Sequence, residues 1–236
     1  KSSVYGVCFS PDGKWLASGA WDRTIRLWQA DTGTELRVLQ GHGSSVNSVA
    51  FSPDGHMLAS GASDHTVRLW QPDSGATLQV LKGHMGRVTS VAFSSDGHVL
   101  ASGAFDHTVR LWQPDSGALV RILRGHGSTV TSVAFSPDGR VLASGSYDGT
   151  VRLWEVATGR CLGWLVAEGE SWAVGLPDGR YKAVGSLPEA FWHVIGLCRF
   201  EVGELDEFVP GLRLPPEQSL HALPDGRSDT VAQTTT

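Results

Sequence analysis

One unit of 42 residues is written four times in this chain, and this repetition constrains the fold more than any other feature. The spacing is constant (70 − 28) between successive members of the set Trp28, Trp70, Trp112 and Trp154. It also separates Asp22, Asp64, Asp106 and Asp148. A fixed period of this length is typical of a repeat array, in which each unit packs on its neighbours. The units cover residues 1–40, 41–82, 83–124 and 125–166 without a linker.

Each unit predicts a four-stranded antiparallel sheet. In the second unit the strand-like stretches are 46–52, 57–62, 67–70 and 77–81, with turn-forming residues between them. Side chains alternate between the faces of a strand, so Val67 and Leu69 share one face while Trp70 lies on the other. A small sheet that is apolar on both faces must be covered on both. A radial stack of such sheets, arranged as blades, meets this requirement.

The motifs inside the unit resemble those of the WD-repeat family of β-propellers. They comprise a Gly-His pair that opens the unit (41–42, 83–84 and 125–126), a Ser-Pro-Asp-Gly turn, a Leu-Ala-Ser-Gly strand and an Asp six residues before a Trp. The resemblance covers roughly residues 1 to 166. It implies an all-β propeller of four-stranded antiparallel blades, with four regular blades and a divergent fifth.

The divergent fifth blade is expected over residues 167–201. Its first hairpin is expected over 172–186, which aligns with 132–146, and its third strand over 191–201. Residues 202–236 form an irregular acidic extension, whose last residues, from about 224, are expected to be disordered. The first unit starts just after the position of a Gly-His pair, which suggests a piece of a longer protein. Five blades could close a ring alone; an oligomer or completion by upstream blades is the alternative.

The net charge and the lack of long apolar runs argue against nucleic acid and membrane as partners. The net charge is −5, which gives no basic surface for nucleic acid. No apolar run approaches the roughly 18 residues of a membrane helix, so no membrane partner is expected. Three cysteines are an odd count, which favours buried reduced thiols in a cytoplasmic protein over one disulfide with a leftover thiol.

Each complete unit contains a histidine, a serine and an aspartate, which are the residue types of a hydrolase triad, but catalysis is not predicted. A nucleophile needs one exposed oxygen beside an oxyanion hole, whereas these residues recur at the same spacing in every complete unit. The family resemblance implies a buried structural network instead, made of His42, Ser60, Asp64 and Trp70; His84, Ser102, Asp106 and Trp112; and His126, Ser144, Asp148 and Trp154. The first copy keeps Ser18, Asp22 and Trp28.

No metal or cofactor is expected. The turn histidines His56, His65, His98 and His107 have no cysteine or carboxylate set with ligand spacing. The turns also lack the helix that a phosphate-binding loop requires.

Differences between the copies point to a binding face. The residue before the turn aspartate is Trp21, Ser63, Phe105 or Tyr147, and local folding does not require a large side chain there. WD-repeat proteins commonly bind partners through this position and through the third and fifth residues after the opening histidine. The resemblance therefore implies a partner-binding set of Tyr5, Trp21, Asn47, Arg87, Thr89, Phe105, Thr131 and Tyr147.

The favoured function is a non-catalytic protein–protein interaction module that binds a protein or peptide as the scaffold or sensor part of a larger signalling protein. Two alternatives stay open. One is a glycan-binding propeller with sites between blades. The other is an enzyme with its site in the extension, around His193, Cys198, Glu201 and Asp206.

Overall fold

The computed structural model describes residues 2–168, 170–184, 192–195 and 198–201 of the 236-residue chain. These residues form β-strands, turns and loops, with no helix among them. The chain divides into a first unit, Lys1–Ala167, and a second unit, Glu168–Thr236. The described part contains no helix long and apolar enough to cross a membrane.

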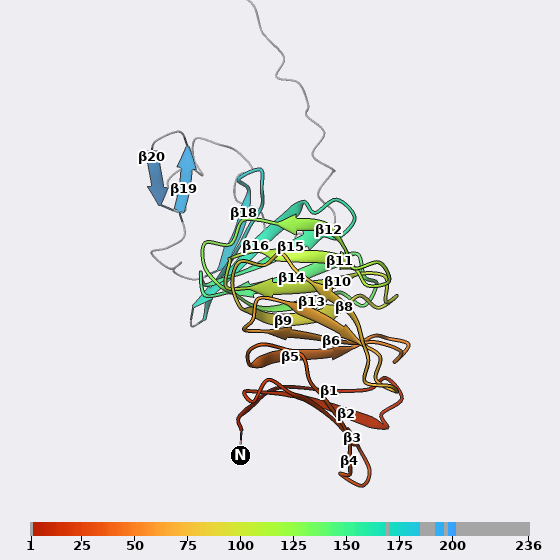
Figure 1. The fold of residues 1–236 in the computed structure, drawn as a ribbon. Helices are drawn as coiled ribbons and strands as arrows, with labels where there is room; N and C mark the ends of the chain where they lie inside the picture. The colour runs from red at the N-terminus through yellow and green to blue at the C-terminus, as the bar shows by residue number, and fades with distance from the viewer. Residues whose placement is uncertain (1, 169, 185–191, 196–197, 202–236) are drawn as a thin grey trace, which may run out of the picture. The chain divides into compact units, whose positions relative to one another are not determined.

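The first unit consists of four antiparallel blades (Figure 1). Blade 1 contains β1 (Val4–Phe9), β2 (Trp15–Ala20), β3 (Ile25–Gln29) and β4 (Glu35–Leu39). Blade 2 contains β5 (Val46–Phe51), β6 (Leu58–Ala62), β7 (Val67–Trp70) and β8 (Thr77–Leu81). Blade 3 contains β9 (Val88–Phe93), β10 (Leu100–Ala104), β11 (Val109–Gln113) and β12 (Ala118–Leu123). Blade 4 contains β13 (Val130–Phe135), β14 (Val141–Ser146), β15 (Thr150–Glu155) and β16 (Cys161–Glu168).

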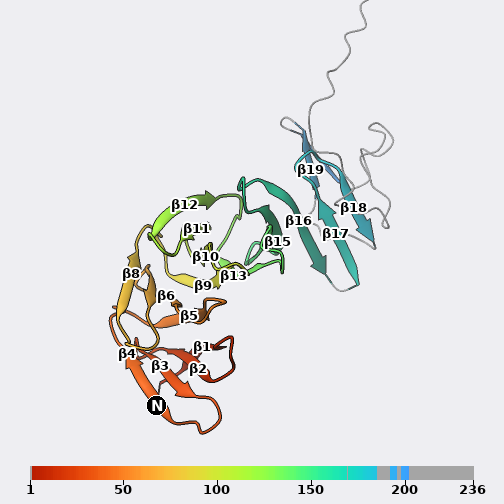
Figure 2. The same ribbon diagram turned by 90° about the vertical axis from the view of Figure 1, so that its right-hand side faces the viewer.

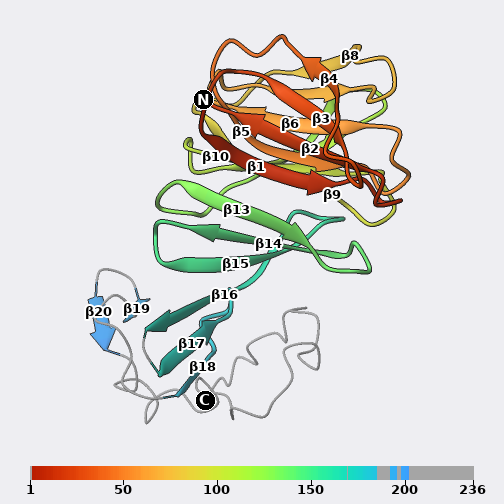
Figure 3. The same cartoon turned by 90° about the horizontal axis from the view of Figure 1, so that it is seen from below.

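Within each blade, strands that are consecutive in the sequence pair with each other, as β13, β14 and β15 do in Figure 3. Figure 2 shows the blades side by side, with the first strands β1, β5, β9 and β13 on the inside and β4, β8 and β12 on the outside. The prediction of an all-β fold built from four-stranded blades is confirmed.

The turn between the first two strands of a blade is held by its own side chains. In blade 2 the Ser52 hydroxyl donates to Asp54 Oδ1 at 2.6 Å, and the Met57 amide donates to Ser52 Oγ at 2.9 Å. Gly55 adopts a φ of 75°, a left-handed conformation that a glycine enters without steric cost. This geometry explains why a Ser-x-Asp-Gly motif recurs at this turn.

Hydrophobic cores lie between the blades. We call the side of a blade that meets the next blade its exit face, and the opposite side its entrance face. The first core joins the exit face of blade 1 (Ala17, Ile25, Leu27 and Leu39) to the entrance face of blade 2 (Val46, Val49, Leu58 and Trp70). The same positions, shifted by one or two repeats, form the cores between blades 2 and 3 and between blades 3 and 4. Each core therefore takes half of its side chains from each of two blades.

Glycine on the second strand permits this close packing. A Cβ atom added to Gly61 would lie 2.5 Å from Val88 Cγ1, and one added to Gly103 would lie 2.6 Å from Val130 Cγ1. Contacts this short do not occur between real carbon atoms, so the valine of the next blade occupies the space that a side chain would fill. The glycine of the Leu-Ala-Ser-Gly strand is therefore required by the valine that packs on it from the next blade.

The second unit contains two described hairpins. Strand β17 (Ser171–Gly175) pairs with β18 (Tyr181–Val184), which agrees with the expected hairpin over 172–186. Residues 191–201 were expected to form one strand; the structure instead pairs β19 (Trp192–Ile195) with β20 (Cys198–Glu201). Gly196 in the sequence disfavours one continuous strand there. The acidic extension over 202–236 lies outside the described residues.

Cys8 and Cys161 are both free thiols. Cys8 lies on β1 and packs partly against the core between blades 1 and 2. Burial raises the pKa of its thiol to about 12, so it stays protonated and unreactive at neutral pH. The burial of Cys8 against this core is consistent with a role in packing.

Candidate functional site

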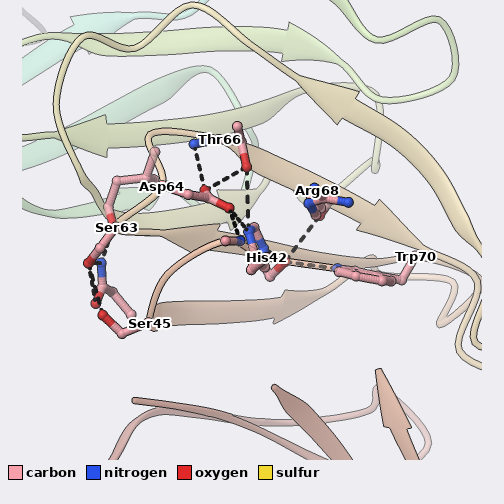
Figure 4. A network of polar contacts seen from close by, with 11 residues as sticks. His42, Ser45, Ser63, Asp64, Thr66, Arg68 and Trp70 are labelled. Carbon is pink, nitrogen blue, oxygen red and sulfur yellow. Dashed lines mark hydrogen bonds and ion pairs between the residues drawn. The ribbon is translucent and has the colours of Figure 1, made fainter. Parts of the chain in front are cut away.

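The network in blade 2 connects strands β6 and β7, the turn between them and the loop that enters the blade (Figure 4). His42 Nδ1 lies 2.9 Å from Asp64 Oδ2, and His42 Nε2 lies 2.7 Å from Ser60 Oγ. The Trp70 indole Nε1 donates to the same serine oxygen at 2.8 Å. The structure therefore brings together all four residues that the resemblance implied for this blade.

Blades 3 and 4 repeat this geometry. The His–Asp, His–Ser and Trp–Ser distances are 2.9, 2.8 and 2.8 Å in blade 3 and 2.8, 2.7 and 2.8 Å in blade 4. The residues are His84, Asp106, Ser102 and Trp112 in blade 3, and His126, Asp148, Ser144 and Trp154 in blade 4. Blade 1 keeps the bond from Trp28 Nε1 to Ser18 Oγ at 2.8 Å.

One protonation pattern satisfies every polar atom of the network. The tryptophan donates to the serine oxygen, the serine hydroxyl donates to histidine Nε2, and histidine Nδ1–H donates to the aspartate. This pattern requires a neutral histidine. Burial lowers the pKa of His126, although its bond to Asp148 opposes that effect, and the neutral form is favoured.

The aspartates are ionised. Burial opposes the charge on Asp64, but hydrogen bonds from His42 and Thr66 outweigh it and lower the pKa of this carboxyl group. The amide of Gly43 also donates to Asp64 Oδ2, at 2.8 Å. Burial likewise opposes the charge on Asp148, where hydrogen bonds lower the pKa to about 2. Each aspartate thus fastens the loop entering a blade to the turn between its second and third strands.

The network serines are unsuited to nucleophilic attack. Ser60 and Ser102 are fully buried, and Ser144 is nearly so. Each hydroxyl oxygen already accepts an indole N–H. A nucleophile has to reach a substrate carbon beside an oxyanion hole, and these oxygens contact only the protein interior. The arrangement is a buried polar network that stabilises the blade.

The aromatic residues that precede the turn aspartates lie at the tips of the blades. A backbone bond pairs each of them with the loop entering the same blade: Trp21 N donates to Ser3 O, Phe105 N to Arg87 O and Tyr147 N to Thr129 O, at 2.9 to 3.0 Å. The exposed fractions of these aromatic residues are 64% for Trp21, 36% for Phe105 and 75% for Tyr147. They are large apolar groups that the protein leaves in solvent.

Blade 3 has the most elaborate tip. The Arg87 guanidinium carbon lies 3.6 Å from the centre of the Phe105 ring, a stacked cation–π contact. Gly86 makes room for it, because a Cβ atom on Gly86 would lie 2.8 Å from Phe105 Cβ. Met85 is 85% exposed beside them. We call the surface formed by Trp21, Met85, Arg87, Phe105 and Tyr147 the loop-tip face.

Blade 2 differs, because its tip is small and polar. Ser63 replaces the aromatic residue, and its hydroxyl oxygen accepts hydrogen bonds from Ser45 Oγ and Asn47 Nδ2, both at 3.1 Å (Figure 4). The tips therefore differ in chemistry from blade to blade, although the blades beneath them are nearly identical.

The remaining predicted partner-binding residues lie on the first strands. Tyr5 is more than half exposed on β1. Asn47 and Thr89 are half-buried, and their side chains donate to backbone oxygens of the next blade, Val88 O at 2.7 Å and Val130 O at 2.6 Å. Thr131 donates to Gly145 O at 3.1 Å within its own blade. In this structure Asn47 and Thr89 connect neighbouring blades.

Sequence reasoning missed Met85 and Gly86. Met85 stands where the other complete copies have Gly43 and Gly127, and Gly86 where they have serine. A comparison of the copies at these positions would have identified both. The predicted absence of a metal site is not tested, although the described residues contain no cluster of three potential ligands. His65 and His107 occupy left-handed turn positions, with φ of 68° and 64°.

Stacked four-stranded blades that share cores, with a buried His–Ser–Asp–Trp network in blades 2, 3 and 4, define a β-propeller repeat protein. The family model described as "WD domain, G-beta repeat" matches residues 1–29, 33–71, 75–113 and 117–155, more than half of the chain. The chain belongs to the WD-repeat family.

Several curated proteins match short segments of the chain. The general transcriptional corepressor TUP1 of Saccharomyces cerevisiae is 54% identical over 39 residues, 16% of this chain and 6% of TUP1. A Notchless protein homolog of Arabidopsis thaliana is 51% identical over 39 residues, 16% of this chain and 8% of the homolog. An uncharacterised WD repeat-containing protein of Nostoc sp. is 50% identical over 42 residues, 18% of this chain and 3% of that protein. The matches thus span less than a tenth of each relative.

Proposed function

We propose that this chain is a non-catalytic interaction module that binds a protein or peptide partner through the loop-tip face. WD-repeat proteins generally act as scaffolds for protein interactions, which supports the general class. The observation that carries the specific proposal is the exposure of Trp21, Met85, Phe105 and Tyr147 on blade tips.

The chemistry of these side chains suits a protein partner. Aromatic residues, methionine and arginine are enriched in interfaces, and tryptophan, tyrosine and arginine dominate the binding energy. Arg87 is held over Phe105 before any partner arrives, so less side-chain entropy is lost on binding. The polar tip of blade 2, with Ser63, Ser45 and Asn47, supplies hydrogen-bonding groups to the same surface.

The test compares two triple variants. The first replaces Trp21, Phe105 and Tyr147 by alanine, and the control replaces Leu36, Leu78 and Val120, which are exposed on the outer strands β4, β8 and β12. Both remove three exposed apolar side chains, and the thermal unfolding midpoint of each shows whether the fold is intact. Partners are captured from lysate by the unaltered chain, identified by mass spectrometry, and measured with each variant.

We expect the loop-tip variant to lose at least about 30-fold in affinity for a captured protein, since a hot-spot residue contributes roughly 2 kcal/mol or more. The control should bind as the unaltered chain does. Equal binding by both variants would refute the proposal. If the captured material binds only through its glycans, the glycan-binding alternative replaces it.

We also propose that the module is the scaffold or sensor part of a larger cytoplasmic signalling protein. Support comes from the near-identical neighbouring repeats and from the reduced state of Cys8 and Cys161. Fractionation of the native protein with a membrane or secreted fraction would contradict this setting.

A further inference from the structure

The loop that enters blade 3 departs from the repeat at three successive positions. Residues 85–87 read Met-Gly-Arg, whereas the same positions read Gly-Ser-Ser at 43–45 and Gly-Ser-Thr at 127–129. The strand that follows, β9, has the same sequence as its counterpart β13. The change is therefore confined to the loop, and the packing of the blade does not explain it.

Phe105 holds the Arg87 side chain in place at this tip. The Phe105 amide donates to Arg87 O at 3.0 Å, and the guanidinium carbon lies 3.6 Å from the centre of the ring. Gly86 leaves the space that this contact needs. Both Arg87 and Phe105 are exposed. Stacking covers one face of the planar guanidinium, whose N–H groups point outward in its own plane and stay available to a partner.

No carboxylate neutralises Arg87. Its side chain makes neither a hydrogen bond nor an ion pair with any residue that the structure describes. The carboxylate of the same tip, Asp106, is already engaged: His84 Nδ1 and the Met85 amide contact its Oδ2, and Thr108 donates to its Oδ1. Arg87 is thus an ordered cation whose donors have no acceptor within the described part of the chain.

The other tips hold no competing free carboxylate. Asp64 and Asp148 each contact the histidine and a loop amide of their own blade, as Asp106 does. Asp22 accepts hydrogen bonds from the Thr24 amide and hydroxyl group. Among the described tips of blades 1 to 4, every aspartate is therefore occupied, and the charge of Arg87 favours an acidic partner.

We propose that the tip of blade 3 recognises a carboxylate side chain, an aspartate or a glutamate, in a bound peptide segment. This carboxylate site rests on the function proposed above and names the chemistry that the loop-tip face selects. The Arg87 guanidinium donates two parallel N–H···O bonds to the carboxylate, which its planar fork matches. Met85, 85% exposed on the same loop, packs against an apolar residue beside that carboxylate.

Selection from a peptide library on the full chain tests this proposal. Short peptides, random at every position and fused to a carrier at both ends, carry neither a free C-terminus nor a phosphate group. Any carboxylate that binds is then a side chain of aspartate or glutamate. The enriched peptides are synthesised with capped ends, and the Kd of each is measured with the unaltered chain and with each variant.

Arg87→Glu reverses the charge at the tip, and Arg87→Lys keeps the charge but removes the planar fork. Arg140→Glu is the matched control, because it makes the same change of charge at an exposed arginine in the turn between β13 and β14. Both arginines are exposed, so all three variants should keep the thermal unfolding midpoint of the unaltered chain.

We expect the enriched peptides to share an aspartate or glutamate beside an apolar residue. Arg87→Glu should weaken their binding at least about tenfold and Arg87→Lys at least about threefold, whereas Arg140→Glu should change it by less than about twofold. A peptide whose carboxylate residue is replaced by lysine should bind the Arg87→Glu chain at least about tenfold more tightly than the original peptide does. A purely structural role for Arg87 would not produce this exchange of specificity.

The variant that replaces Trp21, Phe105 and Tyr147 by alanine separates the two possible failures. Peptides that need these aromatic residues but share no carboxylate, or that bind the Arg87→Glu chain unchanged, would overturn the carboxylate site and leave the proposed function standing. Peptides insensitive to both variants, or a selection that enriches none, would overturn the carboxylate site and also count against the loop-tip face as a binding surface.

Discussion

The buried serine of blade 3 offers the sharpest test of the network. Ser102 is fully buried and accepts the Trp112 indole N–H at 2.8 Å, while its own hydroxyl faces His84 Nε2 at 2.8 Å. Ser102→Ala removes the oxygen and leaves both partners buried without a hydrogen bond. A buried polar group left unpaired costs about 1 to 3 kcal/mol, so the variant, which leaves two such groups, should lose about 2 to 6 kcal/mol of unfolding free energy.

Ser18→Ala in blade 1 is the matched control. Ser18 Oγ accepts the indole N–H of Trp28, which is half-buried, and no bond between Ser18 and a histidine is found among the described residues. Water can replace the lost partner of a half-buried indole, so this variant should lose only about 1 kcal/mol. Equilibrium urea unfolding, followed by tryptophan fluorescence in dilute solution, measures both losses.

The difference between the two losses measures how much the connection from Trp112 through Ser102 to His84 stabilises blade 3 beyond a single bond between serine and tryptophan. If Ser102→Ala costs no more than Ser18→Ala, the network does not stabilise blade 3 beyond a single hydrogen bond, and the structural interpretation is wrong. A loss confined to Ser102→Ala also excludes a general effect of removing a hydroxyl group from the second strand.

Two further predictions concern packing and pH. Gly103→Ala should lower the free energy of unfolding by about 1 to 3 kcal/mol, because its Cβ would lie 2.6 Å from Val130 Cγ1. Gly145→Ala should change this free energy by no more than about 0.5 kcal/mol in dilute solution. Equal losses for the two variants, measured by urea unfolding, would contradict the packing described for Gly103. The pKa of Asp148 is about 2 in the folded protein, below its ordinary value of 3.8, so its contribution is full above about pH 5 and is lost as the pH falls through 3.8 towards 2. The stability difference between the unaltered chain and Asp148→Asn should therefore be constant above pH 5 and narrow below pH 4, and a difference that widens in acid would refute this sign.

The period of 42 residues was enough to predict the blades. Alternation along each strand put apolar side chains on both faces, and only stacking can bury both. The network followed from the family resemblance, since spacing alone does not distinguish a buried Ser60 from an exposed nucleophile. The burial of Ser60 and its hydrogen bond to His42 are seen only in the structure.

Other features depend on contacts that the sequence does not display. Asn47 and Thr89 bond to backbone oxygens of the next blade, about 41 residues away, and no local pattern announces such a partner. The fit of Phe105 against Gly86 likewise depends on how two loops approach each other. The short hairpin of β19 and β20 replaced an expected single strand, because a weak strand signal does not fix where a chain reverses.

The sharing of each core between two blades bears on how such an array changes over evolutionary time. Because the exit half of one copy has the same chemistry as that of the others, any copy can precede any other. Duplication or deletion of a whole 42-residue unit then leaves every remaining junction with its proper partner. Unequal recombination between near-identical coding repeats can therefore change the number of blades while every interface between neighbouring blades keeps matching side chains. The residues at the blade tips lie outside these interfaces and can diversify.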